Sequence, residues 1–305
     1  TRRSSDLGLM RVADQQMYNT LLGNLQRSRL QMLTSQEQIS SQKRVATPED
    51  DPSSYGQIVL DKSALSQTNQ WIRNINFGTS RVNAADQALG QVQTLITRVR
   101  ELTIQASSDT TSAEGRQSIA KEVRQLQRQL VQLGNTEVAG QAVFGGTKTN
   151  VSPFVVTTGD TVTYQGNTET QSISVGENQT VQILVPGSSI FTGGTTNMFD
   201  SLRDLLTALE SNNRSSIQAG IGNLDLATAQ ISDAQGTIGA LANRLQVTHD
   251  ALDTATLTIS KAISDNQDAD LATAISQLSL QQVAVQAASQ TFSKIFDASL
   301  LNYLP

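Results

Sequence analysis

The sequence predicts a mainly α-helical protein, in which long coiled-coil-like helical rods from both halves of the chain accompany a small β-rich insert. Two patterns predict this fold class. Apolar residues recur every seven positions over long stretches of both halves, and in one short central stretch the period falls to two. A seven-residue repeat keeps one seam of a helix against a partner helix, whereas strict alternation is typical of a half-buried strand.

The longest repeat lies in the second half of the chain. Its apolar positions stand seven residues apart and are Ile217, Leu224, Ile231, Ile238, Leu245, Leu252 and Ile259. At 1.5 Å per residue, a helix over this stretch spans roughly 65 Å, which is longer than a compact domain is wide. The repeat therefore predicts a rod.

The first half predicts three helices. Between Arg11 and Arg44 the seam residues are Tyr18, Leu25, Met32 and Ile39. Two prolines, Pro48 and Pro52, end this helix, since neither fits a helix interior. A second rod carries Ile58, Leu65 and Ile72, followed by Val82, Leu89 and Ile96, and a third helix carries Ile119, Val123, Leu126, Leu130 and Leu133.

The β-rich insert is expected between about Gly145 and Gly194. Alternating residues at 162–164, 173–175 and 181–185, separated by turns at 166–167 and 176–179, predict short antiparallel strands. Glycines stand near both ends of the insert and few apolar residues remain to dock it. We therefore expect the helical region to fold without it.

After the insert, an apolar helix follows at 199–209, and then the long rod. The seam loses register at 265–268 and resumes almost to the chain end. In this layout the second half of the chain runs back along the first, so the N-terminal and C-terminal helices should lie side by side. We expect both helices to contact further copies of the protein when it assembles. The predicted assembly interface consists of Tyr18, Leu25, Met32, Ile39, Leu271, Ile275, Leu278, Val285, Phe292 and Phe296.

These patterns predict the following domain organisation. Residues 1–9 have the composition of a tag or vector remnant before a native start at Met10. The remaining segments are an N-terminal helix of an inner domain (10–44), the two parts of a helical rod domain (45–146 and 197–262), the β insert (147–196) and the C-terminal helix of the inner domain (263–305).

Composition excludes several function classes. Aromatic residues are only 4% of the chain, which is little for an enzyme core, and the net charge of −5 does not suggest a nucleic-acid partner. No cysteine is present and His249 is the only histidine, so multi-histidine and thiolate metal sites are impossible. No apolar run has the length of a signal peptide or a membrane span. The protein is expected in the cytosol, or outside the cell by a route without a cleaved signal.

Three motifs suggest chemistry, and each has a simpler interpretation. Gly140–Thr147 nearly matches a phosphate-binding loop but has Gly146 in place of the lysine, so it is expected to be a glycine-rich exit from the helical region. The acidic residues at 265–270 lack the glycine and glutamate of a calcium loop and are expected to cap a helix. The acidic residues at 49–51 belong to a proline-bounded turn. No cofactor, metal site or enzymatic activity is predicted.

Several segments, in order and with matching spacing, resemble the flagellin superfamily of bacterial flagella. Ile39–Val45 with Pro48–Pro52 resembles its link after the terminal helix, Arg98–Ala106 a signature helix end, and Asp268–Thr273 the start of its last helix. Within that superfamily, Gln141–Thr149, Leu278–Ala288 and Ser299–Leu304 are more similar to the hook-associated proteins of the hook–filament junction. The small insert agrees with that branch.

The resemblance implies a structural subunit that is exported unfolded by the flagellar type III route. Its implied partners are hook-associated protein 1, flagellin, copies of itself in a ring, and an export chaperone that binds the C-terminal helix. Its implied location is the extracellular hook–filament junction. Two alternatives remain open: a minor flagellin that forms filament itself, and a cytosolic coiled-coil scaffold or signalling protein.

Overall fold

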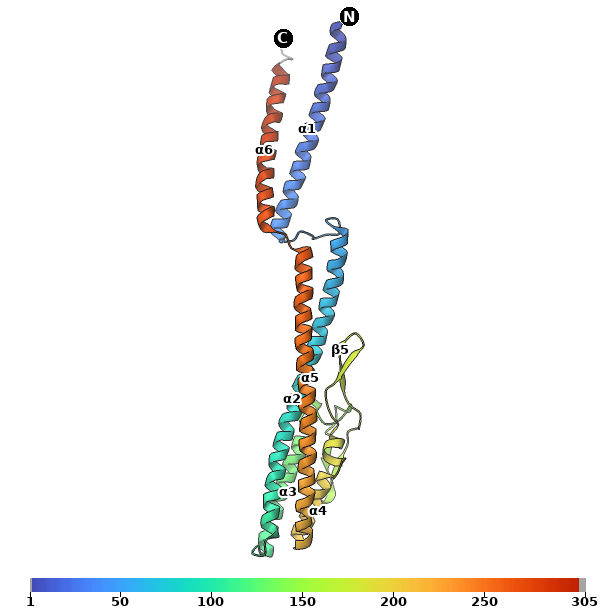
Figure 1. Cartoon of the computed structure of the whole chain (residues 1–305), viewed down its shortest axis with the longest axis vertical. Coiled ribbons are helices and arrows are strands. Elements are labelled where there is room, and N and C mark those ends of the chain that lie inside the picture. The colour runs from blue at the N-terminus through green and yellow to red at the C-terminus, as the bar shows by residue number, and fades with distance from the viewer. Residues whose placement is uncertain (1, 302–305) are drawn as a thin grey trace. The chain divides into compact units, whose positions relative to one another are not determined.

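The computed structural model describes residues 2–301, and within them the side chains of residues 16–291, 293 and 294. Figure 1 shows the fold, in which long helices dominate and the strands are confined to one insert, so the predicted fold class is confirmed. The chain forms two compact units, one of residues 1–66 with 257–305 and the other of residues 67–256. Helices α2 and α5 contribute residues to both units.

The elements follow one another as helices, insert and helices. The helices are α1 (Arg2–Ser41), α2 (Pro52–Ser107), α3 (Ala113–Gly134), α4 (Met198–Glu210), α5 (Arg214–Gln267) and α6 (Leu271–Leu301). The insert and its entry hold β1 (Glu137–Val138), β2 (Gln141–Ala142), β3 (Phe154–Val156), the 3-10 turn η1 (Thr158–Asp160), β4 (Val162–Tyr164), β5 (Ser172–Gly176), β6 (Gln179–Gln182) and the π-helical turn η2 (Ser188–Thr192).

Unit 67–256 contains one continuous apolar core made by α2, α3, α4, α5 and the insert. The α5 seam predicted from sequence is confirmed: Ile217, Ile231 and Leu245 are completely buried. So are Val82, Leu89 and Ile96 of α2. Ser112 caps the start of α3 by accepting a hydrogen bond from the backbone N–H of Gly115 at 3.1 Å. That cap explains why the polar stretch after α2 becomes a turn.

The α2 seam differs from the prediction in its first half. Leu65 and Ile72 are only partly buried, whereas Ile75, seven residues before Val82, is completely buried. Seven residues earlier the same register places Thr68, which is also buried. The repeat thus continues through a polar residue, which a search for apolar side chains alone does not detect.

The insert consists of three separate two-stranded antiparallel sheets, β1–β2, β3–β4 and β5–β6. The predicted strands around 162–164 and 173–175 are confirmed as β4 and β5, and the 176–179 turn joins β5 to β6. Asn178 in that turn has φ 71°, the left-handed conformation that tight hairpin turns require and that asparagine tolerates. The predicted strand at 181–185 ends earlier, at Gln182.

The expectation that few apolar residues dock the insert is wrong. Phe154 of β3 and Phe191 of η2 are almost completely buried, and their rings lie 5.1 Å apart at an interplanar angle of 76°. Phe199 of α4 lies 5.2 Å from Phe154, between ring centroids. The Phe154 ring also comes so close to Gly134 that a Cβ there would meet it at 2.7 Å. The insert therefore shares its core with the helices.

Arg81 of α2 joins the helix to the entry of the insert. Its guanidinium donates to Oε1 of Gln141 at 2.9 Å and to the carbonyl of Ala142 at 2.7 Å. The side chain is completely buried, and desolvation lowers its pKa. This buried cation holds β2 against α2 through neutral acceptors.

In unit 1–66 with 257–305, the two breaks in the helical pattern are bonded to each other. The backbone N–H of Arg44 donates to the carbonyl of Gln267 at 2.7 Å, and that of Ala269 donates to Gln42 at 3.0 Å. Asp270, in the acidic cluster expected to cap a helix, does so: it accepts from the backbone N–H of Thr273 at 3.3 Å at the start of α6. Asp51, expected only in a turn, also caps a helix, because it accepts from the backbone N–H of Ser54 at 3.1 Å at the start of α2.

Candidate functional site: the paired terminal helices

Helices α1 and α6 lie side by side, as predicted, and form the candidate assembly site (Figure 1). The centre of their contact is small and polar. Ser35 and Ala274 are each 4% exposed, and the Ser35 hydroxyl donates to Oε1 of Gln281 at 3.1 Å. Because small side chains allow close approach but bury little area, this pairing contributes little apolar burial.

The predicted interface residues have two different environments. Leu25, Met32, Ile39, Leu278 and Val285 are partly buried along the seam between α1 and α6. Tyr18, Leu271 and Ile275 are 40%, 38% and 53% exposed. The side chains of Phe292 and Phe296 lie outside the described residues. The structure thus brings five predicted residues into one intramolecular seam, and whether they also meet another subunit stays a prediction.

The small residues of this seam were missed by the sequence reasoning. Along α6 the buried and partly buried positions are Ala274, Leu278, Gln281, Val285 and Ala288, spaced alternately by four and three residues. This is the spacing of a helix seam, but alanine and glutamine carry no hydropathy signal at those places. Extending the alternating four- and three-residue spacing from Leu278 and Val285 would have identified Ala274, Gln281 and Ala288 as seam positions.

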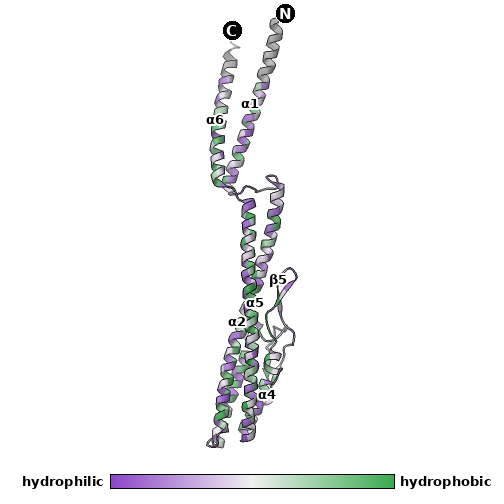
Figure 2. Cartoon of the chain, viewed as in Figure 1, coloured by the Kyte–Doolittle hydropathy of each residue, from purple (hydrophilic) through white to green (hydrophobic). Residues whose placement is uncertain are grey.

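A second group of apolar residues lies away from the seam. Leu30 and Leu33 of α1 are 65% and 57% exposed, and Leu280 and Val283 of α6 are 69% and 66% exposed. Leu280 stands two residues after Leu278, so it projects roughly 200° around the helix from the seam. Figure 2 shows hydrophobic residues interleaved with hydrophilic ones along both helices. Both helices therefore expose apolar surface, and large exposed apolar patches are typical of surfaces that bind a partner.

The motifs weighed for chemistry have structural roles. The glycine-rich loop is filled by the chain itself, because a Cβ at Gly146 would collide with the Asn167 side chain, and the Thr147 N–H donates to that side chain at 2.9 Å. His249 lies 3.2 Å from the carboxylate of Asp253, one turn along α5. Among the described residues no cluster of His, Asp and Glu could hold a metal ion. In that same part of the chain no helix has the length and apolar character to cross a membrane.

Two family models match this chain. The bacterial flagellin N-terminal helical region matches residues 12–149, and the bacterial flagellin C-terminal helical region matches residues 221–304. Together they match well over half of the sequence and leave out residues 150–220, which hold nearly all of the insert, α4 and the start of α5. They therefore cover both terminal helices and most of both rods.

Individual flagellar proteins are similar to this chain over longer spans than the family models cover. Flagellar hook-associated protein 3 of Salmonella typhimurium is 27% identical over 95% of this chain and 98% of its own length, and that of Escherichia coli matches to the same extent. A flagellin of Treponema pallidum is 26% identical over 82% of this chain and 84% of its own.

Solved structures show the same fold. A putative flagellar hook-associated protein from Vibrio parahaemolyticus superposes with a TM-score of 0.66 at 19% identity, covering 72% of this chain and all of the other. Hook-associated protein 3 of Legionella pneumophila gives a TM-score of 0.62 at 15% identity, covering 68% of this chain and 98% of its own.

Proposed function

Because the chain belongs to the bacterial flagellin family and its relatives are structural proteins of the flagellum, we propose that it is a non-enzymatic subunit of the hook–filament junction. The observation that carries this proposal is the extent of its likeness to the two enterobacterial hook-associated proteins 3. That likeness runs through 98% of their length. For the flagellin of Treponema pallidum the corresponding share is 84%.

The paired terminal helices supply the mechanism. A two-helix hairpin buries little apolar area, and α1 and α6 leave Leu30, Leu33, Leu280 and Val283 largely exposed. Each fully buried leucine or valine contributes about 1.5–3 kcal/mol relative to an exposed one. Helices of neighbouring copies would cover these side chains, so assembly would stabilise the terminal helices together with the junction.

In this proposal the subunits form a ring, with hook-associated protein 1 on the hook side and flagellin on the filament side. The inner domain would consist of residues 10–44 and 263–305, and the rod domain of residues 45–146 and 197–262. The insert, 147–196, would face outward. The chain would travel unfolded through the flagellar channel, and a chaperone would hold its C-terminal helix before export.

A minor flagellin is the second candidate, because flagellins are among the relatives of this chain. The two functions differ in what the purified protein does to filament seeds. A flagellin elongates the seeds, whereas a junction protein leaves their length unchanged. A cytosolic scaffold, the third interpretation, would be absent from the flagellum.

The decisive experiment is immunolabelling of detached flagella. The proposed function predicts label confined to the boundary between hook and filament. Label along the whole filament would favour the flagellin, and absence of label would contradict a flagellar role.

A substitution tests the mechanism. Leu278→Asp places a charge in the α1–α6 seam, and we expect exported protein that no longer joins hook to filament, so that flagellin is shed into the medium. Intact filaments on cells that export this variant normally would contradict a role of the terminal helix in the junction. Gln277→Asp, which introduces the same charge at an exposed position of α6, is the matched control.

A further inference from the structure

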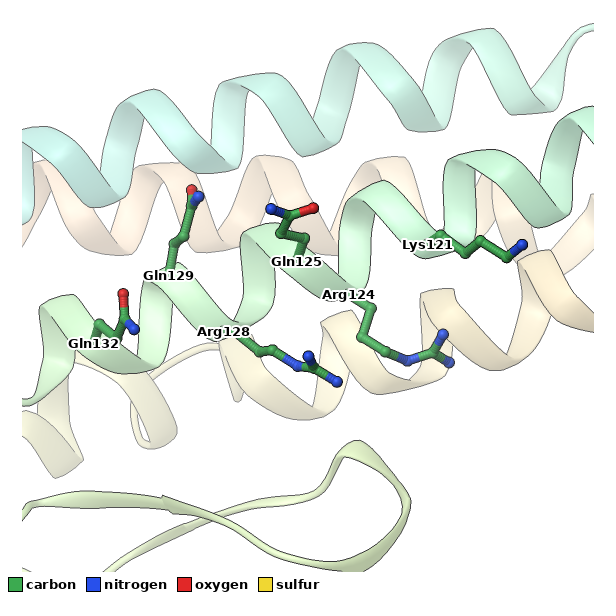
Figure 3. Close-up of a pocket in the computed structure, with 6 residues that line it drawn as sticks. All are labelled: Lys121, Arg124, Gln125, Arg128, Gln129 and Gln132. Carbon is green, nitrogen blue, oxygen red and sulfur yellow. The ribbon is translucent and has the colours of Figure 1, made fainter.

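Helix α3 presents a polar groove in which two of the three cations, Lys121 and Arg128, form no ion pair among the described residues. The groove has a volume of about 430 Å³ and is lined by Lys121, Arg124, Gln125, Arg128, Gln129 and Gln132, all on α3 (Figure 3). A second hollow of about 420 Å³ shares Gln129 and Gln132 with it and extends to Gln91 and Thr94 of α2. Together they form a continuous glutamine-rich surface in unit 67–256.

The cations of this groove differ in whether they form ion pairs within the chain. Arg124 donates to the carboxylate of Asp160 at 2.8 Å and also contacts Glu210, so its charge is compensated within the chain. Lys121 and Arg128 are exposed, and among the described residues neither forms an ion pair. Helix α3 carries four basic residues against two acidic ones. The groove therefore keeps a positive charge that the subunit does not compensate.

The insert has the opposite charge. The charged residues between 147 and 196 are Lys148, Asp160, Glu169 and Glu177, which gives the insert a net charge of −2. Asp160 already pairs with Arg124. Glu177, in the turn between β5 and β6, is exposed and has no ion-pair partner in the described part of the chain, and Glu169 accepts only from the Thr147 hydroxyl, at 3.1 Å.

We propose that the α3 groove of one subunit binds the β5–β6 hairpin of a second copy of this chain, and the single charged residue of that hairpin is Glu177. The Arg124–Asp160 pair shows within one subunit the kind of contact that Lys121 and Arg128 would make with Glu177 between subunits. The two surfaces differ, so the contact is heterologous, and repetition of a heterologous contact closes a ring when the rotation between copies allows it. This inference rests on the proposed function, since it specifies the lateral contact of that ring.

Exposed ion pairs are individually weak, so the contact would select register and neighbour while other surfaces supply most of the affinity. The glutamines of the groove provide side-chain donors and acceptors for the backbone of an exposed hairpin edge. The hairpin is a two-stranded sheet, so no further strand pairs with its outer edges, although the Ser174 carbonyl of β5 accepts a hydrogen bond from Asn74 of α2 at 2.9 Å. The proposed occupant therefore matches the groove in charge and in hydrogen bonding.

The absence of cysteine from the sequence allows a clean cross-linking test. Cells would produce two full-length variants together, Gln125→Cys in the groove and Thr180→Cys on the hairpin, and detached flagella would be treated with a short bismaleimide. We expect a cross-linked dimer only when both variants are present. Ser232→Cys, at an exposed position of α5, replaces Gln125→Cys in the matched control and should give no dimer.

Charge reversal then tests the cause. Adding Glu177→Lys to the hairpin variant should reduce the dimer about tenfold, and combining it with Lys121→Glu and Arg128→Glu in the groove variant should restore most of it. Glu177→Gln should give an intermediate yield.

Each other outcome overturns the inference. If both variants are present in the flagella and no mixed dimer forms, or if Glu177→Lys leaves its yield unchanged, the hairpin is not held by this groove and the proposed function is untouched. Dimers between two Gln125→Cys chains would show that α3 meets α3. If neither variant is found in flagella, the proposed function fails and this inference fails with it.

Discussion

The middle helix α5 and the terminal helix α6 carry apolar residues at the same seven-residue spacing, yet their side chains are buried to different degrees. Ile217, Ile238 and Leu245 of α5 are completely buried, whereas Leu278 and Val285 of α6 are only partly buried. The difference lies in the number of neighbours. The α5 seam packs into a core shared with α2, α3, α4 and the insert, and the α6 seam faces α1.

A heptad spacing specifies which face of a helix packs, whereas the number of neighbouring elements sets how much of that face is buried. A helix surrounded by several elements folds with the subunit. A helix with one neighbour leaves apolar side chains exposed, as Leu280 and Val283 of α6 are. The four predictions below test this contrast, from the largest expected effect to the smallest.

The sharpest test places the same charge in both seams. Leu245→Asp should destabilise the subunit by several kcal/mol, because a carboxylate in this fully buried position has no compensating partner. Leu278→Asp should shift thermal unfolding only slightly, since its site is partly open to water. Thermal unfolding followed by circular dichroism measures both. Equal losses of stability would refute the contrast between the two helices.

The second test concerns the insert, whose Phe154 is buried in the core shared with the helices, unlike the apolar side chains that the terminal helices expose. Phe154→Ala should cost about 3–5 kcal/mol, because the ring contacts Phe191, Phe199 and the close approach at Gly134. Val155→Ala on the same strand should change stability by less than about 0.5 kcal/mol, as its side chain is 40% exposed. Urea unfolding compares the two. Replacement of residues 148–193 by a linker should accordingly impair the helical region.

Amide exchange tests the contrast without substitution. In the monomer, amides of α5 between 217 and 245 should exchange at least about a hundredfold more slowly than those of α1 and α6, because local opening costs least where few apolar contacts are lost. Mass-spectrometric hydrogen exchange on the dilute protein measures this difference. Comparable protection at both places would mean that the α1–α6 pair is stable alone.

The smallest effect is expected from pH. Hydrogen bonds from the Thr47 backbone lower the pKa of Asp50 below its ordinary value near 3.8, and the Thr273 hydroxyl does the same for Asp270. A lowered pKa in the folded state means that the ionised carboxylate stabilises the fold. That contribution is complete above about pH 4 and is lost as the pH falls further.

The effect of pH should appear as a loss of amide protection at the start of α6, relative to the intrinsic exchange rate at each pH, as the pH falls below about 4. Asp270→Asn should abolish this change, since asparagine can cap the helix without titrating. Asp233→Asn, at an exposed position of α5, should leave the change intact. An identical pH response in wild type and Asp270→Asn would exclude Asp270 as its source.

The sequence alone determined the helical architecture, because periodicity is a local property that survives in any environment. The α5 seam, the breaks near Pro48 and Asp268, and the capping role of Asp270 could all be predicted from spacing and residue type, whereas the capping role of Asp51 was not. The resemblance to flagellins depended on the order of short motifs. The pairing of α1 with α6 followed from a chain that goes out and returns.

Only the tertiary structure decided how deeply each seam is buried and what docks the insert. Phe144, Phe154, Phe191 and Phe199 are scattered along the chain, and nothing in their spacing shows that they meet in one core. Likewise, Ser35, Thr68 and Ala274 occupy seam positions without any apolar signal. The burial of a side chain depends on how many other side chains pack around it. Many of these come from distant segments of the chain, so only the complete fold determines which of them meet.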